Sequence, residues 1–124
     1  MQHRAILRLA TLLLLVVILY FALEPRPPKL FDWSDKTEHI LAFLALASCA
    51  RLAWARAHPL LLFVLITGFG AAIELAQWTM GLGRQADMKD WVADVFATVA
   101  GLAAAEIFLW LWRPAEAEEA AQSD

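Results

Sequence analysis

Four long apolar runs, separated by short polar stretches, dominate the pattern of this 124-residue chain. The runs cover residues 9–23, 40–57, 59–80 and 91–112. A helix of about 20 residues, with a rise of about 1.5 Å per residue, matches a hydrocarbon core about 30 Å thick. The first run follows Arg4 and Arg8 but has no small-x-small cleavage site, so we expect a retained first helix. The pattern predicts an all-α fold, a four-helix transmembrane bundle.

Prolines and charges mark the connections between these runs. Residues 24–36 (EPRPPKLFDWSDK) contain too much proline and charge to be helical throughout, and we expect them in water or at the membrane surface. Pro59 suits the first position of the third helix, and Pro114 follows the last run. We therefore predict one membrane domain over residues 1–114 and a disordered acidic tail over residues 115–124.

The composition supports a membrane protein, since 61% of the residues are hydrophobic, more than a soluble domain of this size can bury. The formal net charge of -3 comes largely from the tail and the borders of the runs. No basic stripe of the kind that binds nucleic acid is present, so we predict no nucleic-acid partner. Cys49 is the single cysteine and is interpreted as a small packing residue.

The lysines and arginines divide equally between the two sides of the predicted bundle, five on each. The first helix usually decides such a tie, and its N-terminal arginines favour an orientation with both termini in the cytoplasm. The two sets are Arg4, Arg8, Arg51, Arg56 and Arg113 on one side, and Arg26, Lys29, Lys36, Arg84 and Lys89 on the other.

Polar residues gather at three borders of the apolar runs. An even number of crossings brings the first and third loops to the same side of the membrane, so we expect these residues to converge in one pocket. Ionisable groups inside a membrane indicate a functional site by default. The candidate ligand-binding residues are Asp35, Lys36 and His39 before the second run, Glu74 and Gln77 in the third, and Arg84, Asp87, Asp90 and Asp94 before and in the fourth.

The three aspartates are spaced i, i+3 and i+7, which places them on one face of a helix, and we expect that face to point into the bundle. Glu74 lies about two turns inside its helix, so we expect it to be protonated or paired with His39, Arg84 or a cation. A simpler alternative is that Glu74 and Gln77 join helices through hydrogen bonds.

A structural ion pair is predicted on the opposite side. Arg51 lies 12 residues after His39, and Glu106 lies 12 residues after Asp94, on helices that run in the same direction. The two side chains should therefore reach the same depth. The alternative is that each extends separately to the interface.

Taken in order, these segments resemble the VanZ-like family of small membrane proteins over residues 35–101. This chain departs from the family pattern at Asp94, where members commonly carry asparagine. The resemblance implies a polytopic inner-membrane protein, and the founding member is associated with resistance to the glycopeptide teicoplanin. The matching motifs are Asp35-Lys36-x-x-His39-x-x-x-Phe43, Ala72-Ile73-Glu74-x-x-Gln77, Gly83-Arg84, and Asp87-x-x-Asp90 followed by Asp94.

Three functions remain open. The first is a non-enzymatic pocket, facing outward, that binds a lipid head group, a lipid-linked envelope precursor or a glycopeptide, with Lys36, Arg84 and Lys89 as cationic contacts. The second is a metal-dependent intramembrane hydrolase or phosphatase in which His39 or Glu74 is the general base. The third is a non-catalytic partner subunit of an envelope complex. We predict no cofactor or resident metal, expect membrane lipids as partners, and leave the catalytic residues and oligomeric state open.

Overall fold

The computed structural model contains four helices and, within the residues it describes, no strand. It describes residues 2–25, 29, 31–81 and 87–113. The predicted all-α fold is therefore confirmed, whereas the predicted tail over residues 115–124 lies outside the described residues. The helices are α1 (Gln2–Leu23), α2 (Asp35–Ala53), α3 (Pro59–Met80) and α4 (Met88–Leu111).

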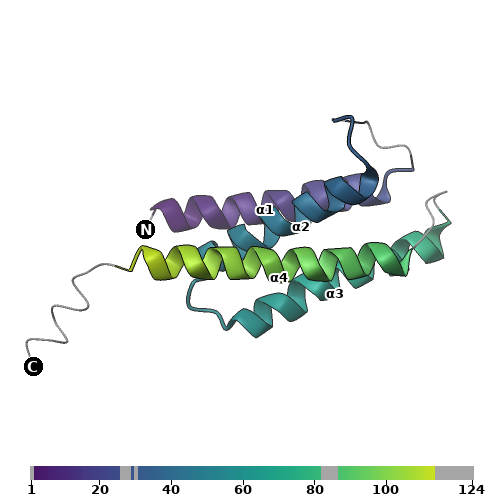
Figure 1. Cartoon of the computed structure of the whole chain (residues 1–124). Helices are drawn as coiled ribbons and strands as arrows, with labels where there is room; N and C mark the ends of the chain where they lie inside the picture. Colours follow the sequence, from purple (N-terminus) through teal and green to yellow (C-terminus); the bar gives the residue numbers. More distant parts are fainter. Residues whose placement is uncertain (1, 26–28, 30, 82–86, 114–124) are drawn as a thin grey trace, which may run out of the picture.

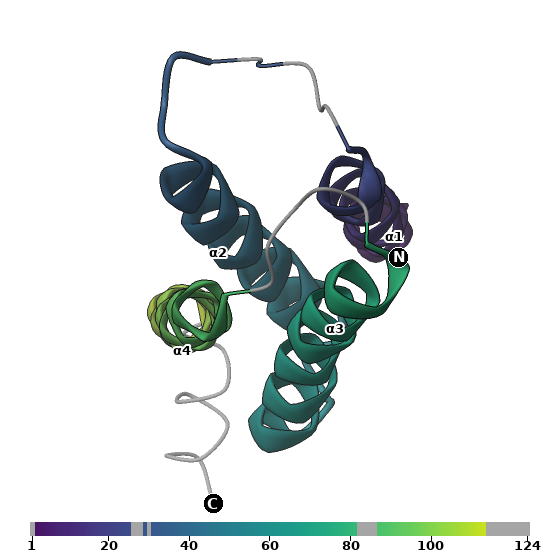
Figure 2. The ribbon, with the colours of Figure 1, turned by 90° about the vertical axis from the view of Figure 1, so that its right-hand side faces the viewer.

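Helix α2 lies at the centre of the bundle. It packs against each of the other three helices, most extensively against α4. The end-on view shows α2 crossing obliquely between α1, α3 and α4 (Figure 2). The C-terminal ends of α1 and α3 and the N-terminal ends of α2 and α4 lie together, as Figure 1 shows, and we call this the polar end. The helix ends that border the first and third loops therefore lie on the same side of the bundle, as predicted.

Three of the four helices, α1, α3 and α4, are long and apolar enough to cross a membrane. This indicates an integral membrane protein. The fourth helix of the predicted bundle, α2, has 19 residues and lower mean hydropathy because Asp35, Lys36 and Glu38 belong to its first turn and Arg51 to its last. Its neighbours bury one face of α2, which includes Phe43 and Leu46, whereas Ile40 and Leu41 are exposed.

Two helices begin earlier than the sequence indicated, because each has a capping side chain. The apolar runs begin at residues 40 and 91, whereas α2 begins at Asp35 and α4 at Met88. Ser34 Oγ accepts a hydrogen bond from the Thr37 amide at 3.2 Å. Such caps satisfy amides that have no partner within the helix. Helix α3 matches its predicted bounds, and Gly81 follows it in the left-handed conformation (φ 59°) typical of helix C-termini.

The tightest packing lies between α2 and α4. Phe43 and Ala47 of α2 are fully buried, as is Thr98 of α4. A Cβ atom at Gly101 would lie 2.5 Å from the Leu44 carbonyl oxygen and 2.9 Å from Ala47 Cβ, so only glycine fits at this crossing.

Candidate functional site

His39 and Asp94 form the innermost contact between ionisable groups at the polar end. His39 Nδ1 lies 3.6 Å from Asp94 Oδ1. The Asp94 side chain is 3% exposed and that of His39 is 18% exposed, so the carboxylate is buried and the imidazole is partly exposed. Asp94 Oδ1 accepts no hydrogen bond within the described part of the chain. A protonated His39 would give this buried carboxylate a cationic neighbour.

Gly70 of α3 makes room for this pair. A Cβ atom there would lie 3.3 Å from the Phe43 ring and 3.5 Å from Asp94 Oδ2. The carboxylate is therefore held between α2, which supplies His39, and the glycine-containing face of α3. The Thr98 hydroxyl donates to the Asp94 carbonyl at 2.7 Å, so it is bonded to the backbone of its own helix.

Glu74 joins α3 to the beginning of α4. Its Oε2 accepts a hydrogen bond from the Asp87 amide at 3.0 Å. It is also close enough to Asp90, Asp94 and His39 for charge–charge interaction. Glu74, His39 and Asp94 therefore lie near one another, and the hydrogen-bond partner of Glu74 is a backbone amide, in line with the helix-joining alternative.

Gln77 joins α3 to the end of α1. Its Nε2 donates to the Ala22 carbonyl oxygen at 2.8 Å, and both residues are buried. Carbonyls in the last turn of a helix lack a partner in that helix, and a side-chain donor satisfies one of them. The position of Gln77 accordingly supports a structural role.

The remaining predicted residues are more exposed. Asp87 is exposed and caps α4, with Oδ1 accepting from the Lys89 amide at 2.9 Å, and Asp90 is half-buried. The expectation that all three aspartates point into the bundle is therefore corrected: Asp94 is buried, whereas Asp87 serves the helix terminus. Asp35 and Lys36 are exposed at the start of α2. Arg84 lies outside the described residues.

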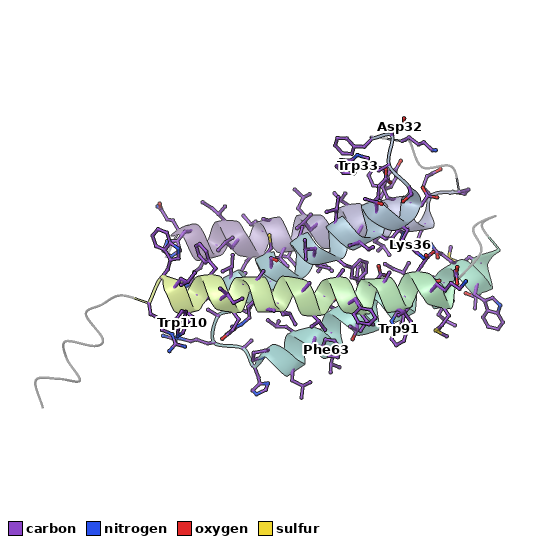
Figure 3. The ribbon with its side chains drawn as sticks, viewed as in Figure 1. Asp32, Trp33, Lys36, Phe63, Trp91 and Trp110 are labelled. Atoms are coloured by element: carbon purple, nitrogen blue, oxygen red, sulfur yellow. The ribbon has the colours of Figure 1, made fainter. Side chains whose placement is uncertain are left out.

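A cavity of about 230 Å³ lies beside His39, between α1, the segment before α2, and α2 itself. Phe31 and Trp33 form part of its wall, and their rings are stacked with centroids 4.6 Å apart. Figure 3 shows Trp33 in the segment that leads into α2. The other described lining residues are Val17, Ile18, Phe21 and Ala22 of α1, and Asp35, Glu38, His39, Leu41 and Ala42 of α2.

The cavity is amphipathic, since most of its lining is apolar and its polar groups come from the first two turns of α2. His39 belongs both to this lining and to the contact with Asp94. Its volume is below the roughly 300 Å³ at the lower end of drug-sized pockets. A compact head group and the first part of an alkyl chain would fit better than a whole lipid.

Sequence reasoning missed three features of this end. Glu38 lines the cavity but was left out of the candidate residues, although it lies one residue from His39. Trp91 Nε1 donates to the Thr67 carbonyl at 3.1 Å and joins α4 to α3. The cavity wall formed by Phe31 and Trp33 depends on the path of the segment before α2, and no local pattern predicts that path.

The predicted ion pair between Arg51 and Glu106 is present at the other end of the bundle. Arg51 Nε lies 2.6 Å from Glu106 Oε2. The same guanidinium donates to the carbonyls of Trp54 (3.3 Å) and Ala55 (2.7 Å), beyond the end of α2. Arg51 is buried and Glu106 is half-exposed. The pair joins α2 to α4 at the end of the bundle opposite the polar end.

Among the described residues, no three His, Cys, Asp or Glu side chains form a group that could hold a metal ion. Comparison with known proteins gave no match to a family model, a curated protein or a solved structure.

Proposed function

We propose that this protein is a non-enzymatic binding protein of the membrane that holds an amphiphilic ligand, a lipid or a lipid-linked envelope precursor, in the cavity between α1 and α2. The supporting observation is the combination of an apolar lining with His39, which is backed by the buried Asp94. An alkyl chain gains free energy by leaving water for apolar walls, and a few polar groups then fix the orientation of the head group.

The position of the cavity also supports a ligand that comes from the bilayer. Two of its walls belong to α1 and α2, and many apolar side chains of α1 are exposed to the surroundings of the bundle. Phe31 and Trp33 lie beside the polar groups at the start of α2, and tryptophan prefers the depth of lipid head groups. A lipid entering along α1 would place its head group near His39.

Photolabelling tests this proposal. The full-length protein in nanodiscs would be irradiated with a phospholipid that carries a diazirine in its acyl chain, and the labelled peptides mapped. We expect labels on Val17, Phe21 and Leu41, and a loss of these labels in Ala42→Phe, which fills the cavity. Ala45→Phe, at an exposed position of the same helix, is the matched control and should keep them. If Ala42→Phe does not fold, Ala42→Leu serves instead, because its smaller side chain fills part of the cavity.

Unaltered labelling of these three residues in both Ala42 variants would contradict the proposal, as would their absence in the wild type. Circular dichroism of each variant checks that the four helices are retained.

A metal-dependent intramembrane hydrolase or phosphatase is the second candidate function. The observation that favours it is the imidazole of His39 beside a buried carboxylate and a cavity, because a carboxylate can orient a histidine that acts as a general base. Purified protein would be incubated with phospholipid with and without Mg²⁺. Hydrolysis of the phospholipid that depends on Mg²⁺ and disappears in His39→Gln would favour the catalytic function over the binding function.

The VanZ-like resemblance adds a biological setting to the binding proposal. We propose an inner-membrane protein of the cell envelope with both termini in the cytoplasm and a link to glycopeptide resistance. Reporter fusions at each terminus test the orientation. Teicoplanin susceptibility of cells with and without the protein tests the link, and unchanged susceptibility would count against it.

A further inference from the structure

The polar groups of the cavity are arranged on one face of α2. Asp35, Glu38 and His39 are spaced i, i+3 and i+4, so they are neighbours across one helical turn, and all three line the cavity. Lys36 lies one residue after Asp35, on a different face, and does not belong to the described lining. The described lining therefore presents two carboxylates and one imidazole.

Asp94 adds a third carboxylate behind the imidazole. It is 2% exposed, and its Oδ1 lies 3.6 Å from His39 Nδ1. A positive charge on His39 would be offset at once by Asp94, so the cavity side of α2 retains the negative charge of Asp35 and Glu38. An anionic head group, such as one with a free phosphate and no amine, would be repelled there, and a cation would be attracted.

The stacked rings of Phe31 and Trp33 provide a second, independent feature of the same wall. The face of a tryptophan ring attracts ammonium groups, and this attraction increases when the ion is partly removed from water. Carboxylates beside an exposed aromatic face therefore complement a positively charged nitrogen. Val17, Phe21 and Leu41 continue the wall with apolar side chains that suit an alkyl chain.

We infer that the cavity selects an amphiphile whose head group carries a positively charged amine, and discriminates against an anionic head group. This inference rests on the proposed binding function, and it names the class of ligand. The amine would be held between the carboxylates of Asp35 and Glu38 and the ring of Trp33, with the alkyl chain along α1.

Quenching of Trp33 fluorescence tests this selectivity. The full-length protein would be placed in nanodiscs of phosphatidylcholine that contain increasing fractions of phosphatidylethanolamine or phosphatidylglycerol with the same brominated chains. Subtracting the signal of Trp33→Phe isolates Trp33 from the other five tryptophans. The difference in Trp33 quenching between the wild type and Ala42→Phe measures the lipid bound in the cavity. We expect this difference to reach half of its maximum at a lipid fraction that is at least threefold lower for phosphatidylethanolamine than for phosphatidylglycerol.

Charge-neutral variants identify the groups responsible. Asp35→Asn combined with Glu38→Gln should abolish the preference while the cavity still takes up lipid. Asp32→Asn, which removes a carboxylate just before α2 that does not line the cavity, is the matched control and should keep the preference. Equal half-maxima for the two lipids in the wild type would overturn the inference and leave the binding function standing. If neither lipid gave a component sensitive to Ala42→Phe, the proposed binding function itself would fall.

Discussion

Replacing Gly101 with alanine tests the closest contact between α2 and α4. The added Cβ would lie 2.5 Å from the Leu44 carbonyl oxygen, which is backbone and is unable to rotate away, and 2.9 Å from Ala47 Cβ. The helices would have to separate. That separation would also weaken the hydrogen bond of 3.1 Å from Ser48 Oγ to the Gly101 carbonyl.

The expected change in the free energy of unfolding combines two effects that lower it and one that raises it. Overpacking in a well-packed interior costs about 1–3 kcal/mol, and the rigid obstacle here places Gly101→Ala at the upper end. A weakened hydrogen bond adds up to about 1 kcal/mol. The greater helix propensity of alanine recovers about 1 kcal/mol. We therefore expect the free energy of unfolding to fall by about 2–3 kcal/mol, which is roughly a 30- to 150-fold change in the unfolding equilibrium.

Unfolding of purified protein in mixed micelles with increasing sodium dodecyl sulfate, followed by tryptophan fluorescence, measures this change. Gly68→Ala is the matched control, because within the described part of the chain its Cβ would meet no atom of another element within 4 Å. It should leave stability unchanged or raise it by up to about 1 kcal/mol. If Gly101→Ala were as stable as Gly68→Ala, the close crossing of α2 and α4 would be refuted.

Three further predictions concern the polar end. Gln77→Leu removes the donor to the Ala22 carbonyl and should lower the free energy of unfolding by about 1 kcal/mol in the same assay; an unchanged value would mean that the bond contributes nothing. His39→Gln and Asp94→Asn should be non-additive, with a coupling of at least about 0.5 kcal/mol in a double-mutant cycle, whereas additive effects would show that the two side chains act independently. Trp91→Phe removes the donor from α4 to α3 while leaving a smaller aromatic ring at this position, and it should cost at least about 1 kcal/mol; equal stability would refute this link.

The helices of this protein could be predicted from sequence because their signals are local. Pro59 begins α3 and Gly81 ends it, each for a reason of backbone conformation that acts within one turn. The ion pair between Arg51 and Glu106 was also accessible, since equal offsets from His39 and Asp94 on helices of the same direction imply equal depth. The start of α2 was placed too late because the capping role of Ser34 was overlooked.

The partners of the polar residues could not be predicted, because they depend on how helices distant in sequence are placed. The contact of Gln77 with Ala22 requires the relative depth of α3 and α1, and no spacing within either helix fixes it. Glu74 was expected to be protonated or paired with His39, Arg84 or a cation, and the structure adds a hydrogen bond from a backbone amide at the start of α4 to its Oε2. The sequence shows which residues are polar and at what depth of each helix they lie. Their hydrogen-bond partners depend on how the helices pack, which the sequence pattern does not give.

Native mass spectrometry of the purified full-length protein, released from nanodiscs of mixed phospholipids, tests the binding function most directly. We predict one retained amphiphile of phospholipid mass on the wild type and on Ala45→Phe, and its loss from Ala42→Phe. Equal retention by all three proteins, or no retained amphiphile on the wild type, would contradict a ligand site between α1 and α2.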